Sequence, residues 1–204
     1  MTTRSEYPVI DSETVFRGRI LSLRRDRVRM SDGTVAAREV VEHLGAVAVA
    51  ALDGQGRILL VNQYRHPVAT RLDELPAGLL DVDGEPALAA AARELSEEAD
   101  VSASIWHVLL DLYPSPGFST EAIRIFLARG LSPVPEADRF EREHEEITMT
   151  VRRVPLEQAV SAALQGVITN AAAVAGILAA AHGQATGWSE LRAADAPWPA
   201  RPGH

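Results

Sequence analysis

The sequence predicts an α/β fold in which helices pack on both faces of a mixed sheet, preceded by a region of N-terminal strands. Two observations support this fold class. Short apolar runs typical of strands lie on both sides of one long amphipathic segment, and two more helical segments follow the last of these runs. The order of strands and helices is also mixed rather than strictly alternating. With 204 residues, 47% of them apolar, the chain is long enough for one sizeable core.

The first part of the chain, residues 1–40, is predicted to form strands. In RILSLRRDRVRM, residues 19–30, the alternation of side chains is typical of a strand. The next four residues, SDGT, favour a tight turn. We therefore expect an N-terminal β-hairpin.

A second hairpin is predicted at the centre of the sheet. The segments GAVAVAAL (45–52) and RILLVNQY (57–64) are separated by DGQG, which is typical of a turn. Both segments are nearly all apolar, as strands buried on both faces are.

The clearest helix is PALAAAARELSEEA, residues 86–99. Pro86 suits its first turn, and Leu88, Ala92, Leu95 and Ala99 form an apolar stripe. Further strands are expected at residues 106–113, 121–128 and 147–154, and helices ended by glycine at 155–166 and 170–183. Residues 184–204, rich in Ala, Pro and Arg, are predicted to form a loose tail.

Composition and charge exclude several classes of function. A net charge of -8 argues against a nucleic-acid or anionic-membrane partner, because those surfaces select basic patches. The absence of cysteine excludes disulfides and thiolate metal sites. The N-terminus lacks the apolar core of a signal peptide, and no apolar run approaches the length of a membrane span. We expect a soluble, cytoplasmic protein.

Three carboxylates gather on one side of the predicted helix. Glu94, Glu97 and Glu98 are neighbours at helical spacing, where like charges repel by a few tenths of a kcal/mol per pair, roughly. Such a cluster is often only a solvated face. A hard divalent cation would remove the repulsion, because carboxylate oxygens on one helix face can hold one or two such ions.

The residues around this helix resemble the Nudix box. That pattern is Gly, five residues, Glu, seven residues, Arg-Glu, an aliphatic residue, any residue, Glu-Glu, any residue, Gly and an aliphatic residue. The matching residues here are Gly78, Glu85, Arg93, Glu94, Leu95, Glu97, Glu98 and Val101. There are two departures: six residues separate Gly78 from Glu85, and Asp100 replaces the last glycine. Asp can adopt the left-handed conformation of that glycine at a modest penalty. Neither departure changes one of the box glutamates that could bind a metal.

The resemblance runs from Arg38 to about Gly183, and a Nudix domain is expected at residues 41–183. The segments QYRHP, ELPAGLLD and SPGFSTE look like the ADP-ribose pyrophosphatase branch, in which a proline follows the box by some fifteen residues, as Pro116 follows Val101. This resemblance implies a Nudix α/β/α sandwich. It also implies Mg²⁺- or Mn²⁺-dependent hydrolysis of the pyrophosphate bond of ADP-ribose, giving AMP and ribose 5-phosphate.

The resemblance implies roles for individual residues. Glu94, Glu97, Glu98 and the carbonyl oxygen of Ala77 would hold the metal. Gly78, Glu85 and Arg93 would be structural, with a charge-assisted hydrogen bond tying the loop to the helix. The base that activates water would be a glutamate of EREHEEITM, with Glu146 the first candidate and Glu145 the second; a charged solvent loop would have the same composition.

Substrate binding and assembly are predicted from the same resemblance. The candidate substrate-binding residues are Arg38, Glu39, Arg65, Pro116, Phe118 and Glu121. For the two arginines a surface salt bridge is an equally good interpretation. Relatives of this branch are homodimers whose N-terminal strands cover the partner's site, and we expect residues 1–40 to do the same.

Two other functions stay open at this point. One is a sister hydrolase that acts on a nucleotide sugar or NADH, which would keep the box without relying on the Pro116 loop. The other is a Nudix-like module that binds ADP-ribose without cleaving it. Those regulators carry a DNA-binding domain and often a degraded box, whereas this chain keeps all of the box glutamates.

Overall fold

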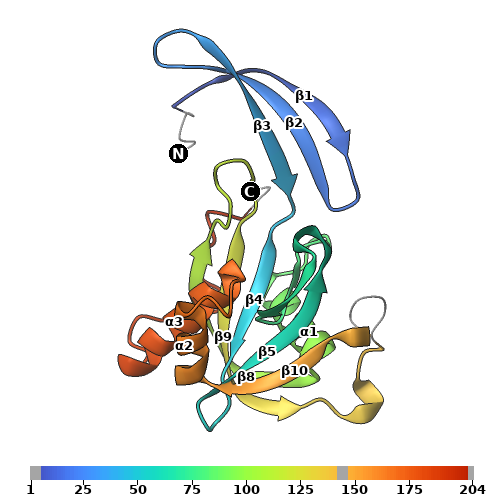
Figure 1. Cartoon of the computed structure of the whole chain (residues 1–204), viewed down its shortest axis with the longest axis vertical. Helices are drawn as coiled ribbons and strands as arrows, with labels where there is room; N and C mark the ends of the chain where they lie inside the picture. Colours follow the sequence, from blue (N-terminus) through green and yellow to red (C-terminus); the bar gives the residue numbers. More distant parts are fainter. Residues whose placement is uncertain (1–5, 142–146, 202–204) are drawn as a thin grey trace.

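A small antiparallel sheet stands at one end of the molecule (Figure 1). The computed structural model describes residues 6–141 and 147–201. The strands of this N-terminal sheet are β1 (Val9–Arg17), β2 (Leu21–Arg29) and β3 (Val35–His43), in that order. The predicted hairpin is confirmed as β2 and β3, whose turn has Gly33 at φ +84°. β1 adds a third strand to this hairpin, within the region where strands were predicted.

The rest of the chain is built around two further sheets. One has the order β11-β8-β9-β4-β7 and is mixed, because β4 runs parallel to β9 and the other pairs are antiparallel. The other is antiparallel, with the order β10-β5-β6. The strands are β4 (Ala46–Ala51), β5 (Arg57–Arg65), β6 (Thr70–Glu74), β7 (Ala77–Leu79), β8 (Val101–Leu112), β9 (Ile123–Pro133), β10 (Thr150–Pro155) and β11 (Arg192–Ala193). Short 3₁₀ turns lie at η1 (His66–Val68) and η2 (Glu136–Asp138).

The predicted central hairpin of residues 45–52 and 57–64 is wrong. A single antiparallel bridge joins Leu52 to Ile58 at the turn, and beyond it β4 and β5 belong to different sheets. β4 is hydrogen-bonded to β7 and β9, whereas β5 is hydrogen-bonded to β6 and β10. Each strand therefore has a neighbour on both sides in its own sheet, which explains the buried apolar runs at residues 46–51 and 58–61.

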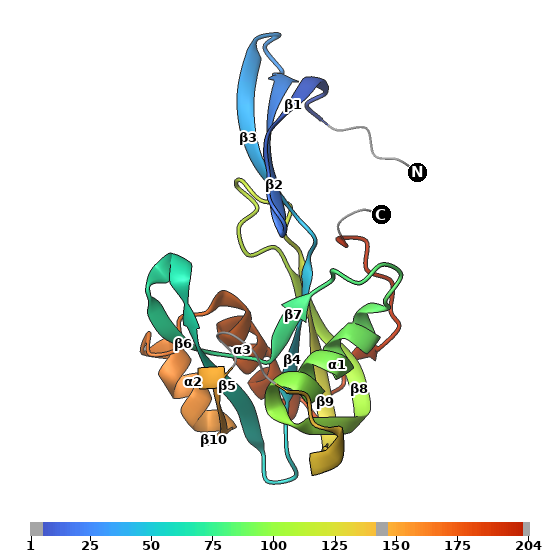
Figure 2. The same ribbon diagram turned by 90° about the vertical axis from the view of Figure 1, so that its right-hand side faces the viewer.

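Helices cover both faces of the body, as predicted (Figure 2). On β4, Val47 and Val49 pack in the same core cluster as α1 (Ala87–Ala99). The alternate residues Ala48 and Ala50 pack in the cluster of α2 (Leu156–Leu164) and α3 (Ala171–Ala185). One strand thus contributes to two cores, and the α/β/α sandwich is confirmed.

The ends of α1 agree with the sequence, but its buried stripe differs by one position. Asp100 is the C-cap at φ 53° and ψ 37°, the left-handed conformation expected where the box pattern has glycine. Ala92 is exposed, and Ala91 takes its place beside Leu95 in the core. Glu98 is also buried, at 6% exposure. The apolar pattern missed it because the stripe contains a carboxylate.

The last helix runs past the predicted glycine end. α3 continues to Ala185, and Thr186 is its C-cap. Gly183 serves packing instead, because a Cβ atom there would lie 2.6 Å from the ring of Trp188. No helix in the described part of the chain is long and apolar enough to span a lipid bilayer.

The segment after α3 was expected to be a loose tail, and its described residues, 186–201, are packed on the body. β11 extends the mixed sheet by pairing with β8. Arg124 of β9 then donates hydrogen bonds to the carbonyl oxygens of Ala196 and Pro197. A buried arginine holds the segment by its backbone, which the Ala- and Pro-rich composition could not reveal.

Candidate active site

The carboxylate face of α1 lies against β7. The backbone N–H of Ala77 donates a 2.9 Å hydrogen bond to Oε2 of the buried Glu98. At the next residue, Gly78, a Cβ atom would overlap the carboxyl group of Glu94. The box glycine is therefore required by close approach: any side chain at this position would displace a predicted metal ligand.

Arg93 supplies the positive charge that lets the glutamates gather. Its Nε and Nη2 each donate a 3.1 Å hydrogen bond to Glu85, which is the predicted tie between loop and helix. Its Nη1 lies 2.7 Å from Oε1 of Glu94 and 3.2 Å from Oε2 of Glu97. These interactions, the hydrogen bonds to Glu85 above all, raise the pKa of Arg93 further above its usual range. The guanidinium therefore stays charged at every relevant pH.

The predicted ligands fit a hard divalent cation by their chemistry but are not arranged as a finished metal site. Among residues 6–141 and 147–201, no group of three or more Asp, Glu or His side chains is arranged to hold a metal. The reason is visible in the contacts: Arg93 engages Glu94 and Glu97, while Glu98 accepts from Ala77. All of the predicted metal-ligating atoms are oxygens, the ligand type that Mg²⁺ and Mn²⁺ prefer. The role of the Ala77 carbonyl stays a prediction.

A cavity of about 580 Å³ opens beside β7, and we call it the central cavity. Ala77 and Gly78 lie in its wall, next to the carboxylate face of α1. Its polar lining also includes two predicted substrate-binding residues, Arg65 and Glu121. Ile20, Val68, Leu72 and Ile123 add apolar surface. A cavity with apolar walls and a few charged groups is what a small polar ligand requires.

Arg65 is held in this cavity by a glutamate that the sequence analysis missed. Its Nε and Nη2 lie 2.9 and 2.7 Å from the two carboxylate oxygens of Glu74, which is only 2% exposed. The hydrogen bond to Glu74 is the largest influence on the pKa of Arg65 and raises it, and the charges of Glu98 and Glu121 act in the same direction. Glu74 stands in the apolar context ELPAG, and a buried charge could have been suspected there.

The Pro116 loop docks on the end of β3. The N–H of Val41 donates to the carbonyl of Phe118 at 2.7 Å, and the N–H of Thr120 donates back to Val41 at 2.9 Å. This contact brings Glu121 to the cavity, with Oε1 3.8 Å from Nδ1 of His43. His43 also lines the cavity and was not predicted. A lone histidine at a strand end carries no signal in the sequence.

Four of the six predicted substrate-binding residues do not line the central cavity, and neither do the α1 residues Glu94, Glu97 and Glu98. Arg38 and Glu39 lie on the N-terminal sheet, where Arg38 donates to the carbonyl of Ala37 and Glu39 lies 3.8 Å from Arg25. Pro116 and Phe118 are on the docked loop, and Phe118 is 58% exposed. Glu145 and Glu146 lie outside the described residues.

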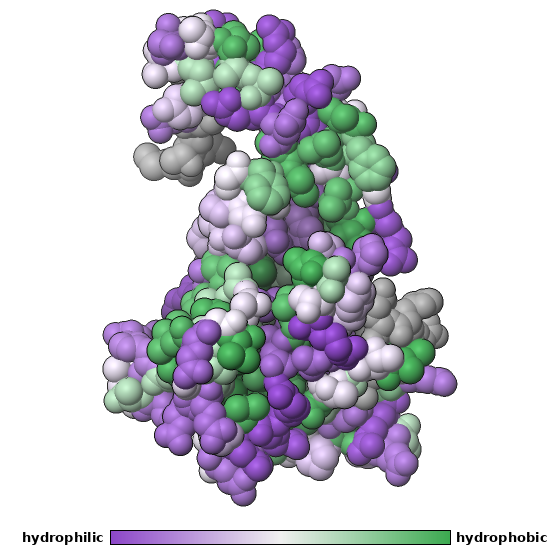
Figure 3. Space-filling model, in the orientation of Figure 1, coloured by the Kyte–Doolittle hydropathy of each residue, from purple (hydrophilic) through white to green (hydrophobic). Residues whose placement is uncertain are grey.

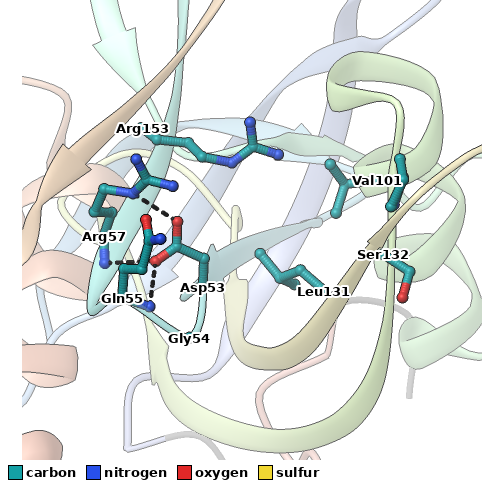
Figure 4. Close-up of a pocket in the computed structure, with 9 residues that line it drawn as sticks. Asp53, Gly54, Gln55, Arg57, Val101, Leu131, Ser132 and Arg153 are labelled. Carbon is teal, nitrogen blue, oxygen red and sulfur yellow. Dashed lines mark hydrogen bonds and ion pairs between the residues drawn. The ribbon is translucent and has the colours of Figure 1, made fainter.

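A second groove, of about 330 Å³, lies at the turn between β4 and β5 (Figure 4). Asp53 organises it by accepting hydrogen bonds from the backbone of Gln55 and from the backbone and side chain of Arg57. Leu131, Ser132 and Arg153 face it from neighbouring strands. None of the predicted site residues lines this groove, so the central cavity is the better candidate for the active site.

The α/β/α fold, the carboxylate face on α1 and the arginine beside it define a class of hydrolases that cleave phosphoanhydrides with divalent metal ions. A NUDIX domain model matches residues 36–175, and a model of the nucleoside diphosphate sugar hydrolase N-terminal domain matches residues 8–41. The chain belongs to the Nudix family. Nudix hydrolases generally use divalent metals.

Two curated relatives and one solved structure agree with this assignment. Over 197 residues the chain is 50% identical to an ADP-ribose pyrophosphatase of Mycobacterium tuberculosis, covering 97% of this chain and 93% of the relative. It is 36% identical over 155 residues to an ADP-ribose pyrophosphatase of Bacillus subtilis, covering 76% and 82%. A crystal structure of an ADP compounds hydrolase superposes with a TM-score of 0.77 at 21% identity, covering 92% of this chain and all of that one.

Proposed function

We propose that this protein hydrolyses the pyrophosphate bond of ADP-ribose to give AMP and ribose 5-phosphate. The observation that carries the proposal is the meeting of two features at β7. Glu98 and Glu94 of α1 lie against Ala77 and Gly78. The same two residues of β7 line the central cavity together with Arg65. Relatives that align over most of their length are ADP-ribose pyrophosphatases.

Each residue then has a physical task. Glu94, Glu97 and Glu98 would hold Mg²⁺ or Mn²⁺, whose chemistry at such a site is to neutralise phosphate charge and to acidify a water molecule. Arg65 presents a charge to the phosphates from its fixed position on Glu74. Arg93 keeps the Glu85 loop attached to the helix. Glu146, or failing that Glu145, accepts the proton of the attacking water.

The second copy of the chain completes the substrate site in this proposal. Arg38 and Glu39 lie on the N-terminal sheet, away from their own central cavity. The sheet has exposed apolar side chains on β1, and Figure 3 shows apolar surface over the end of the sheet nearest the body. In a homodimer these strands would cover the partner's cavity. Glu121 and Phe118 would then face the terminal ribose.

The test is a panel of nucleoside diphosphate derivatives with Mg²⁺ or Mn²⁺, followed by chromatography of the products. ADP-ribose should be hydrolysed with the highest kcat/KM, and excess chelator should abolish the reaction. Binding of ADP-ribose without any hydrolysis would contradict the proposal and indicate a non-catalytic module. Hydrolysis that continues in excess chelator would show that the reaction does not require a divalent metal.

One observation favours a second candidate substrate, a nucleoside diphosphate sugar. Residues 8–41 match the N-terminal domain of nucleoside diphosphate sugar hydrolases. The same panel separates the two candidates. Phe118→Ala should raise KM for ADP-ribose, because the Pro116 loop is proposed to shape the ribose pocket. The ratio of kcat/KM for ADP-ribose to kcat/KM for a nucleotide sugar should therefore fall. If ADP-ribose has no advantage in the unmodified enzyme, the nucleotide sugar is the better substrate.

The base is tested by single substitutions in the acidic segment. Glu146→Gln should lower kcat by roughly 10²- to 10⁴-fold with little change in KM, because a positioned base acts in the transition state. Glu141→Gln is the matched control and should retain wild-type kcat. If Glu145→Gln alone is inactive, the base is Glu145. If all of these variants are active, the base lies elsewhere.

A further inference from the structure

Residues 192–201, which we call the strap, run from beside β8, at the edge of the mixed sheet, to the loop before α1. The strap begins as β11, where Arg192 and Ala193 pair with Val108 and His107 of β8. It then turns, with the N–H of Ala196 donating to the carbonyl of Ala193 at 3.0 Å. Figure 2 shows it passing beside the loop that leads from β7 into α1.

A buried arginine holds the strap in place. The side chain of Arg124 on β9 is 3% exposed. Its Nε and Nη2 lie 2.7 and 3.0 Å from the carboxylate of Asp111, which compensates its charge. Nη1 donates to the carbonyl of Ala196 at 2.6 Å, and Nη2 donates to that of Pro197 at 2.9 Å. A single planar guanidinium thus joins β8 and the strap.

Further along, the strap contacts the start of the Nudix helix. The ring of Trp198 lies 4.9 Å from the guanidinium carbon of Arg124. Nη2 of Arg201 donates a 3.3 Å hydrogen bond to the carbonyl oxygen of Glu85. The strap forms one wall of a cavity of about 390 Å³. Pro86, Ala87 and Leu88 form the opposite wall. The backbone of the Glu85 loop is therefore attached to the strap, while its side chain is attached to Arg93.

We infer that the strap positions the Glu85 loop, and that Arg124 and Arg201 are positioning residues for the carboxylate face of α1. The contacts form a continuous series from Arg124 through the strap to Glu85, and from Glu85 through Arg93 to Glu94 and Glu97. Metal ligands gain affinity when the groups behind them are fixed. The inference rests on the proposed role of these glutamates as metal ligands.

The test compares three variants of the full chain. Arg124→Lys retains a charge beside Asp111, but one ammonium group cannot hold the carboxylate and both strap carbonyls in that geometry. Arg201→Gln removes only the contact at the loop. Arg57→Gln is the matched control, because it loses an ion pair to Asp53 at the turn between β4 and β5, outside the strap.

Two measurements distinguish positioning from general stability. Hydrogen–deuterium exchange of the metal-free protein should rise in residues 80–87 for Arg124→Lys and Arg201→Gln, but not for Arg57→Gln. Calorimetric titration with Mn²⁺ should show a dissociation constant raised by roughly 10-fold or more in the same two variants.

Several outcomes would overturn the inference. One is unchanged exchange in residues 80–87 in both strap variants. Another is exchange that rises equally throughout β8 and β9. If Arg124→Lys does not fold, Arg201→Gln decides the question alone. If the wild-type protein does not bind Mn²⁺, the proposed metal site fails, and the exchange data still decide whether the strap orders the loop.

Discussion

At the scale of single residues, groups next to the glutamates of α1 offset part of their negative charge. Glu98 is buried and loses hydration, and the N–H of Ala77 replaces part of it. Glu94 and Glu97 share one guanidinium nitrogen of Arg93, whose other nitrogens hold Glu85. One arginine therefore offsets part of the like charge on α1. A divalent cation would meet carboxylates that the fold already gathers on one face of α1.

A matched pair of substitutions separates ligand from support. Glu98→Gln keeps an oxygen that can accept from Ala77, so the fold should survive while the charge is lost. Glu85→Gln should weaken the bond to Arg93 and reduce activity by roughly 10- to 100-fold, the usual effect of a residue behind the ligands. Glu98→Gln should cost far more in kcat. Steady-state kinetics with circular dichroism as a fold check would measure both, and equal losses would contradict the assignment.

The residues that the sequence predicted in the Nudix box share a feature that the missed residues lack. Glu85, Arg93 and Asp100 belong to a long spaced motif, and the structure gives the first two their ion pair and the third its left-handed cap. Glu74 and His43 belong to no such pattern. They reach the central cavity because β6 pairs with β5 and β3 leads into β4, and pairing between strands is not written in local composition.

At the scale of secondary-structure elements, the approach of β7 to α1 depends on one glycine. Gly78→Ala would place a methyl group where the carboxyl group of Glu94 lies, so the helix or the side chain must move. We expect weaker Mn²⁺ binding and a kcat reduced by more than roughly tenfold, since small displacements of catalytic groups are costly. Gly54→Ala, with no atom within 4 Å of the new Cβ, is the control. Wild-type metal affinity in Gly78→Ala would refute the packing argument.

The pairing of strands shows where sequence patterns stop being informative. β4 and β5 are both apolar on both faces, and a turn sequence separates them, so a hairpin was the natural prediction. The pattern states that a strand is central, not which strands flank it. Long-range partners such as β9 for β4 depend on the packing of α1 and α3 over the sheet.

The ion pairs of Asp111 with Arg124 and Arg192 make the stability of the folded protein depend on pH. Burial alone would raise the pKa of Asp111, but hydrogen bonds from Arg124 and Arg192 outweigh it and hold the pKa below its usual value. The unfolded chain therefore binds this proton at a higher pH than the folded one. The stabilisation is present above about pH 4, the ordinary carboxyl range, and is lost as pH falls through the lower folded pKa.

Asp111→Asn should remove this contribution and leave Arg124 buried without its counter-charge. We expect the substitution to lower the free energy of unfolding by about 3–5 kcal/mol at pH 7. The difference between the variant and the wild type should become smaller as the pH falls below about 4. Urea unfolding at several pH values measures the difference. Asp138→Asn, at an exposed position, should follow the wild type throughout. A constant gap between Asp111→Asn and wild type would contradict the linkage.

At the scale of the whole molecule, the N-terminal sheet is an unfinished layer. Every residue of β1 is exposed, although Val9, Ile10, Val15 and Phe16 are large and apolar. A sheet normally buries one face against another element. The alternation of side chains predicted strands here, but the sequence of one chain does not show what covers them. The proposed cover is a second copy of the chain, related by a two-fold axis.

This proposal predicts that one substitution dissociates the protein and impairs its site together. Burying a phenylalanine contributes about 1.5–3 kcal/mol, and a two-fold interface counts each change twice. Phe16→Asp should therefore raise the dimer dissociation constant by roughly 10²- to 10⁴-fold. Sedimentation velocity should show monomers at micromolar concentration, with KM for ADP-ribose raised because Arg38 and Glu39 no longer reach the partner's cavity. Glu13→Gln on the same strand should remain dimeric and active. A wild-type protein that is monomeric and fully active would show that each cavity is complete without the partner's strands.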